Sequence, residues 1–213
     1  MKKISVLLAV LFLGVLSVIA QPQLEKGNML FGVTSTVALN GTMSSEFLSL
    51  GLITIKYKSG SDPAEAEYKM TSYNILPRAG YFVADNLVAG LQVIAAGYKE
   101  RHIADDDTYS ENTLGIGPFI RYYYPLDKLY PFIEVESLIG TTKETWYGDD
   151  EKSPFIMIGV LIGASLPLGD NVTFDAAAGY LRASYKNTDA ETEETVNYIS
   201  GGFGLRLGFT IYL

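Results

Sequence analysis

The sequence predicts an all-β protein, an eight-stranded antiparallel up-and-down β-barrel that crosses a membrane. Long stretches alternate large apolar residues with small or polar ones, which is the pattern of strands. Short turns alternate along the chain with long acidic connections. An antiparallel meander with short turns at one end and long loops at the other has this pattern. Hydrophobic residues make up 48% of the chain, yet no stretch after residue 20 reaches the ~18 apolar residues of a membrane helix. This composition also fits a soluble sandwich or a lipocalin-like barrel.

The first 20 residues have the layout of a secretory signal peptide. A basic start at Lys2 and Lys3 precedes an apolar run and the small residue Ala20 at the expected cleavage point. We therefore expect 1–20 to be a signal peptide and 21–213 to form one outer-membrane barrel domain. Removal of Lys2 and Lys3 would take the formal net charge from −8 to −10, which excludes an electrostatic surface for nucleic acid. The absence of Cys excludes a disulfide-stapled scaffold.

From residue 68 onward the alternation predicts seven strands. Three tight turns join six of these strands in pairs, and each turn combines Asp with Asn, Gly or Pro, the residues that favour turn backbone. The turns lie at 83–86, 125–128 and 167–171. The expected strands are roughly 68–82, 87–99, 113–124, 130–146, 154–166, 172–185 and 197–213.

An even strand number requires one more strand upstream, and two segments compete for that place. Residues 28–39 alternate cleanly, whereas the alternation within 47–58 changes phase, which is typical of a β-bulge. Both cannot be full wall strands, because nine strands would put the two chain ends on opposite sides. We expect one first strand assembled from parts of both, with the insertion 40–45 bulging out or folding back.

The long connections carry most of the acidic residues. They hold 15 of the 24 Asp and Glu residues and lie at 59–67, 100–112, 148–153 and 186–195. Two interpretations remain open for them. They keep an exposed rim solvated, or they interact with the surroundings, through divalent cations that bridge to lipopolysaccharide or as an adhesive surface.

The face opposite the large apolar residues is rich in glycine and carries a few charges. In a membrane barrel the apolar face contacts lipid, so this second face lines the interior. Its charges are balanced and include no Lys, which indicates an ion-pair network that fills a narrow barrel. The predicted interior network consists of Arg78, Arg121, Arg206, Glu134, Glu136 and Asp175.

Aromatic residues gather near both ends of the expected strands, and we expect them to form two interfacial belts. The belt near the tight turns would contain Tyr81, Phe82, Tyr122, Tyr123, Tyr124, Tyr130, Phe132, Phe174 and Tyr212. The belt near the long connections would contain Tyr68, Tyr98, Trp146, Tyr147, Tyr185 and Tyr198.

Three segments resemble a known family. They are KGNMLFG (26–32), NILPRAGYFVADNLVAGLQV (74–93) and GIGPFIRYYYPLDKLYPFIEVE (115–136). They resemble small outer-membrane β-barrel domain proteins of Bacteroidetes type, within the broad porin-like group that includes OmpX, OmpW and opacity proteins. The resemblance implies an eight-stranded barrel in the outer membrane of a Gram-negative cell envelope, and no particular reaction. Such barrels mostly end on an aromatic residue, whereas this chain ends Tyr212-Leu213.

The sequence contains no convincing catalytic or metal-binding motif. His102 is the one histidine, and Ser110 is its only candidate partner for nucleophilic chemistry. We therefore expect no enzyme activity, no cofactor and no metal. The predicted function is a monomeric outer-membrane barrel with a plugged interior and a structural or surface role through its acidic loops, inserted by the barrel-assembly machinery through its C-terminal strand. The alternatives are a narrow channel for small solutes and a soluble periplasmic binder.

Overall fold

The computed structural model describes residues 24–38, 51–58, 67–102, 108–124, 126, 128–146, 148–188 and 195–213. The expected signal peptide and the insertion 40–45 lie outside these residues, so the expectations about them stay predictions. Within the described ranges, no helix is long and apolar enough to cross a membrane.

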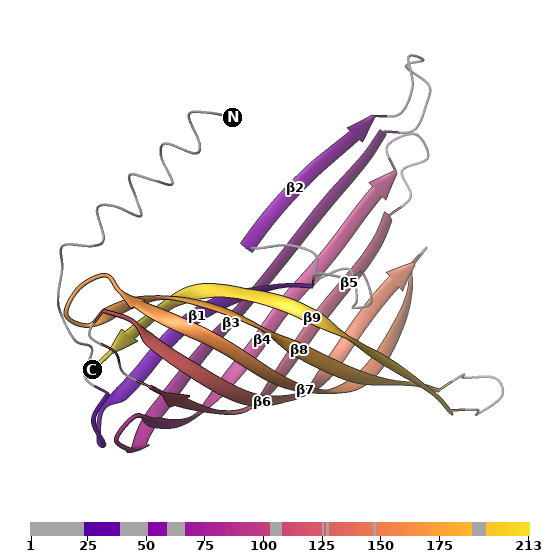
Figure 1. Ribbon diagram of the computed structural model, residues 1–213. Helices are drawn as coiled ribbons and strands as arrows, with labels where there is room; N and C mark the ends of the chain where they lie inside the picture. Colours follow the sequence, from indigo (N-terminus) through magenta and orange to yellow (C-terminus); the bar gives the residue numbers. More distant parts are fainter. Residues whose placement is uncertain are drawn as a thin grey trace.

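The described residues form nine antiparallel strands in one sheet that closes on itself (Figure 1). Neighbouring strands follow the order β1-β9-β8-β7-β6-β5-β4-β3-β2, and β1 also pairs with β3. The strands are β1 (Met29–Ala38), β2 (Gly51–Lys58), β3 (Glu67–Ala84), β4 (Leu87–His102), β5 (Thr108–Tyr123), β6 (Tyr130–Trp146), β7 (Asp149–Pro167), β8 (Val172–Thr188) and β9 (Thr195–Tyr212).

The first of the eight wall positions is shared between β1 and β2. β1 pairs with β3 from Met29↔Tyr81 to Thr34↔Leu76, and its other edge pairs with β9. β2 continues along the same edge of β3 from Gly51↔Asn74 to Lys58↔Glu67. The expectation of one first strand built from both segments is therefore confirmed. Since β1 and β2 share one position, the nine strands make an eight-stranded barrel wall.

The two ends of the barrel differ as expected. The tight turns after β3, β5 and β7 lie at one end, here called the turn end, together with the C-terminal residue (Figure 1). In the first turn Asn86 adopts φ 65°, a left-handed conformation that Asn tolerates better than most residues. Its N–H donates to the Leu24 carbonyl at 2.8 Å, which ties the chain before β1 to the turn end. The opposite end is called the loop end.

All four expected long connections are shorter than predicted, and two of them are shorter by five residues on one side. Residues 149–153 belong to β7, where Asp149 pairs with Trp146, and 108–112 belong to β5. Their acidic composition indicated loops, and that interpretation was wrong. The backbone keeps its ladder because strand pairing still satisfies its N–H and C=O groups, while the charged side chains reach water beyond the apolar band.

The outer face of the barrel is apolar. Residues on alternate positions of the strands are strongly exposed, including Leu91 (58%), Ile139 (58%) and Ile162 (69%). A soluble lipocalin-like barrel would have the opposite polarity. An apolar outside around a charged interior, in a sheet closed without edges at its turn end, is the arrangement of a transmembrane β-barrel. The protein is an integral barrel of the outer membrane.

The buried side chains inside the barrel form three layers. An aromatic layer at the turn end joins the rings of Phe82, Tyr123, Phe132 and Tyr212, with centroids 5.8–6.4 Å apart. A charged layer follows. On its loop-end side lies an aliphatic layer, which comprises Leu76, Ile94, Leu138, Met157, Leu161 and Leu181, all at most 1% exposed.

The aromatic layer corrects part of the belt prediction. Phe82, Tyr123, Tyr130, Phe132 and Tyr212 were expected in the turn-end belt, but they are buried. Because successive strand residues point to opposite faces, they lie inside the barrel while their neighbours Tyr81, Tyr122 and Tyr124 face outward.

Candidate functional site

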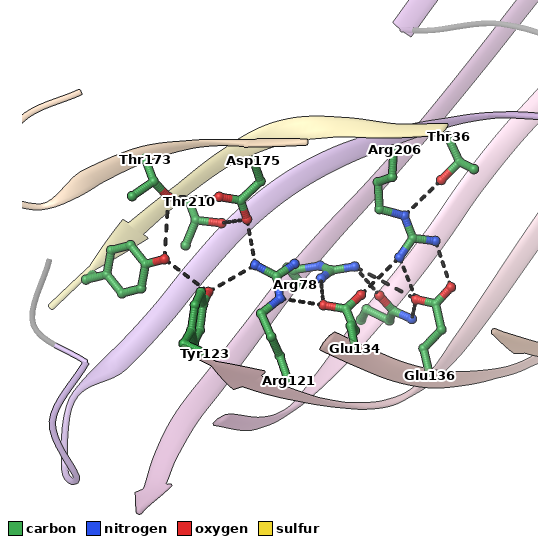
Figure 2. Close-up of polar contacts among 12 residues, drawn as sticks. Thr36, Arg78, Arg121, Tyr123, Glu134, Glu136, Thr173, Asp175, Arg206 and Thr210 are labelled. Atoms are coloured by element: carbon green, nitrogen blue, oxygen red, sulfur yellow. Dashed lines mark hydrogen bonds and ion pairs between the residues drawn. The ribbon is translucent and has the colours of Figure 1, made fainter. Parts of the chain in front are cut away.

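The six charged residues predicted for the interior come together in the middle layer (Figure 2). They are here called the interior charge cluster. Each is at most 4% exposed, and they come from β3, β5, β6, β8 and β9. Successive residues of a strand point to opposite faces, and all six residues occupy positions that point inward. The strands of the wall therefore direct these side chains toward the barrel axis. The cluster comprises Arg78, Arg121, Glu134, Glu136, Asp175 and Arg206.

Glu134 connects three arginines from three other strands. Its Oε2 atom accepts from Arg78 Nη1 at 2.7 Å and from Arg121 Nε at 2.6 Å. Its Oε1 atom accepts from Arg206 Nη1 at 3.2 Å. One carboxylate thus links β3, β5, β6 and β9 across the lumen.

Glu136 forms a second centre two residues along β6. Arg206 donates to both of its oxygens, Nη1 to Oε2 at 2.6 Å and Nη2 to Oε1 at 2.7 Å, which is the bidentate geometry that favours arginine. Gln92 also donates to Glu136 Oε2 at 2.6 Å and accepts from Arg78 Nη2 at 2.7 Å. The uncharged amide of Gln92 therefore connects β4 to both β3 and β6 through hydrogen bonds.

Asp175 anchors the turn-end side of the cluster. It accepts from Arg121 Nη1 at 2.6 Å, from Thr173 at 2.9 Å and from Thr210 at 3.0 Å. Arg121 Nη1 also donates to the Tyr123 hydroxyl at 3.0 Å. The charged layer is in this way bonded to the aromatic layer below it.

Two arginines also stack on rings. The guanidinium carbon of Arg121 lies 3.9 Å from the centroid of Phe132, and that of Arg78 lies 4.7 Å from Phe119. Such cation–π contacts gain strength when water is excluded. Room for the two rings comes from wall glycines, since a Cβ on Gly163 would meet Phe132 Cζ at 2.5 Å and one on Gly90 would meet Phe119 Cε1 at 2.6 Å.

The positive and negative charges of the interior charge cluster are equal in number. Three positive and three negative groups meet away from water, and each carboxylate accepts from at least one arginine. Desolvated charges are tolerated when they are paired and hydrogen-bonded, so the cluster is suited to holding strands together across the lumen.

The polar partners of the cluster were not predicted from the sequence. Gln92, Thr36, Thr173 and Thr210 carry no charge, and only their inward parity could have revealed them. Thr36, for example, accepts from Arg206 Nε at 3.0 Å.

The described residues offer little for catalysis or metal binding. Among them, no group of three or more His, Asp or Glu residues could hold a metal ion. The backbone ladder pairs His102 with Tyr68 and Ser110 with Lys99, so the candidate His–Ser pair is not formed by strand register.

Searches of the sequence against protein-family models and curated proteins find no match. Among solved structures, the fold is similar to the outer membrane protein OprG from Pseudomonas aeruginosa, with 12% identity and a TM-score of 0.46 over 92% of this chain and 99% of that one. It is also similar to the outer membrane protein AlkL in lipid bilayers (12%, TM-score 0.47, 89% and 91% covered) and to Neisserial surface protein A (17%, 0.41, 86% and 95%). Likeness at this level does not extend to activity or ligands.

Proposed function

We propose that the protein is a closed structural barrel whose interior charge cluster plugs the lumen, and that it acts without catalysis. The observation that carries the proposal is the convergence of Arg78, Arg121 and Arg206 on Glu134, at 2.6–3.2 Å, from strands on different sides of the barrel. The buried side chains of the aromatic layer and the aliphatic layer lie on either side of it and support the proposal. A barrel of about eight strands leaves an interior just wide enough for its side chains.

The remaining surface for function is the loop end. In this proposal the barrel is a monomer, and its acidic outer segments face the cell surroundings, where divalent cations bridge them to lipopolysaccharide. β9 pairs with β1 to close the barrel, and we propose that the same strand is recognised by the barrel-assembly machinery. Outer-membrane barrels place short turns toward the periplasm and long loops outside, which sets this orientation.

Recording from planar lipid bilayers tests the plug. The purified barrel, shown to be folded by its heat-dependent gel mobility, should insert without steady ohmic openings in concentrated potassium chloride. The variant Glu134→Ala/Arg206→Ala removes the centre of the cluster and should open measurable conductance if it still folds. Steady openings of the unmodified barrel would overturn the proposal.

A narrow channel for small apolar solutes is the second candidate, and the aliphatic layer is the observation that favours it. Its six side chains line the interior between the charge cluster and the loop end. Ion currents do not report uncharged solutes, so liposomes that contain the barrel should be tested with a small apolar fluorophore quenched inside. Entry faster than into empty liposomes would favour this candidate over the plug.

A further inference from the structure

Cationic side chains gather on the outer face of the barrel at the loop end. They lie on the loop-end side of outward-facing apolar residues of their strand, as Lys143 lies beyond Ile139 in β6 and Arg182 lies beyond Tyr180 in β8. On β3, β4, β6, β7 and β8 they therefore mark where the apolar band gives way to water. Those on described side chains are Lys69, Lys99, Arg101, Lys143, Lys152, Arg182 and Lys186.

Two of these cations face each other directly. Lys143 of β6 and Lys152 of β7 are register partners on the same outward face. Like charges directly opposite in a sheet are destabilising. Asp150 forms an ion pair with Lys143 at 2.7 Å, but one carboxylate balances only one of the two ammonium groups. The pair keeps a net positive charge at the membrane surface.

A hollow adjoins this pair. It has a volume of about 420 Å³, and its lining combines an apolar part with a polar rim. Ala95 and the exposed Leu114 lie on the membrane side, whereas Asn112 lies toward water beside the two lysines. Tyr73 closes one flank, with its hydroxyl 3.4 Å from Asn112 Oδ1. The residues that line the hollow include Tyr73, Ala95, Asn112, Leu114, Lys143 and Lys152.

We infer that this hollow binds the phosphorylated headgroup of a lipopolysaccharide molecule, with Lys143 and Lys152 on a phosphate and an acyl chain along Leu114. Lysine binds phosphate as a point charge, and basic residues beside a membrane attract anionic headgroups. The position at the edge of the apolar band matches a lipid, which needs contacts of both kinds. The inference rests on the membrane placement of the barrel with its loop end outward. It does not depend on a closed lumen.

Lipid binding by purified variants tests the inference. Diphosphoryl lipid A is titrated into the detergent-solubilised barrel, with a chelator present to remove divalent-cation bridges, and bound lipid is counted by native mass spectrometry. The double variant Lys143→Gln/Lys152→Gln should bind roughly 20-fold more weakly. The matched variant Lys26→Gln/Lys128→Gln, which removes two exposed lysines at the turn end, should bind as the unmodified barrel does.

Dephosphorylated lipid A should bind the unmodified barrel as weakly as phosphorylated lipid A binds the double variant. Three results would each overturn the inference. They are unchanged binding by the double variant, equal binding of both lipids, and an equal loss in the turn-end control. Heat-dependent gel mobility confirms that every variant is folded. A barrel that conducts ions but binds lipid A through these lysines would overturn the plug alone.

Discussion

In the interior charge cluster every carboxylate accepts a hydrogen bond from an arginine on another strand, whereas at the outer rim carboxylates lie opposite carboxylates. The outer rim is the loop-end part of β4 to β7, at 98–102, 108–112, 142–146 and 149–153. There Glu111 pairs in register with Glu144, which pairs with Glu151, along the inward face. On the outward face of the same strands, Lys143 pairs with Lys152.

The difference follows from access to water. An unpaired charge in the desolvated interior costs several kcal/mol, so opposite charges must meet there. At the rim Glu151 is exposed and Glu144 is half-buried, whereas Glu111 is as buried as the interior charges. Where water and salt reach such a pair they screen the like charges, and the opposed pair costs only about 0.2–1 kcal/mol. The interior therefore balances its charge internally, while the rim can display net charge to partners outside the protein.

Removing one interior charge should have the largest effect. Arg121→Leu leaves Glu134 and Asp175 without their 2.6 Å partner, and we expect a loss of about 3–5 kcal/mol in the free energy of unfolding. Urea unfolding in detergent, followed through the fluorescence of Trp146, measures it. Arg182→Leu, at an exposed arginine, is the matched control and should change stability by less than about 0.5 kcal/mol. An unchanged unfolding curve for Arg121→Leu would refute the pairing.

A wall glycine should show an intermediate effect. A Cβ on Gly117 would overlap the carbonyl oxygen of Ser137, at the point where the β5–β6 ladder is interrupted between Ile116 and Phe119. Gly117→Ala should therefore cost about 1–3 kcal/mol, because the two strands must separate. Gly169→Ala in the β7–β8 turn meets open space and should be close to neutral in the same unfolding assay. Equal effects of the two changes would argue against close packing of the wall.

The rim should show the smallest effect, with the opposite sign. Partial burial, together with Glu111 and Glu151, raises the pKa of Glu144, a residue beyond the apolar band. Its charged form is therefore disfavoured in the folded barrel. Glu144→Gln removes that charge and should increase stability at neutral pH by about 0.2–1 kcal/mol.

The pH dependence checks the cause of this gain. As the pH falls below the ordinary glutamate pKa of about 4.3, Glu144 is protonated in both folded and unfolded chains and the gain should disappear. Unfolding midpoints of the variant and the unmodified barrel between neutral and acidic pH measure the difference, with Glu25→Gln at the turn end as control. A gain that persists in acid would mean that charge repulsion is not its source.

How far the sequence predicts this molecule depends on how different the two faces of a strand are. Arg206 sits among alternating Leu205, Leu207 and Phe209, so parity alone assigns it to the inward face. In β7 both faces are apolar, with Met157 inward and Ile158 outward, and period-two alternation cannot separate them. Met157 and Leu161 of the aliphatic layer were missed for that reason.

The rim shows the complementary limit. Residues 149–153 were interpreted as a loop because they are charged, yet they pair as a strand beyond the membrane. Charge indicates contact with water and does not by itself indicate the absence of a ladder. The sharing of the first wall position by β1 and β2 could be predicted, because two partly alternating segments competed for one place in a barrel with an even number of strands.

A double-mutant cycle between Arg206 and Glu136 tests most directly the claim that the interior charges stabilise one another. The variants Arg206→Met and Glu136→Leu should each destabilise the barrel by about 3–5 kcal/mol, because each leaves a buried charge without its bidentate partner. The double variant leaves neither, so its loss should fall short of the sum by more than about 1 kcal/mol. Losses that add to within about 0.5 kcal/mol would contradict the account.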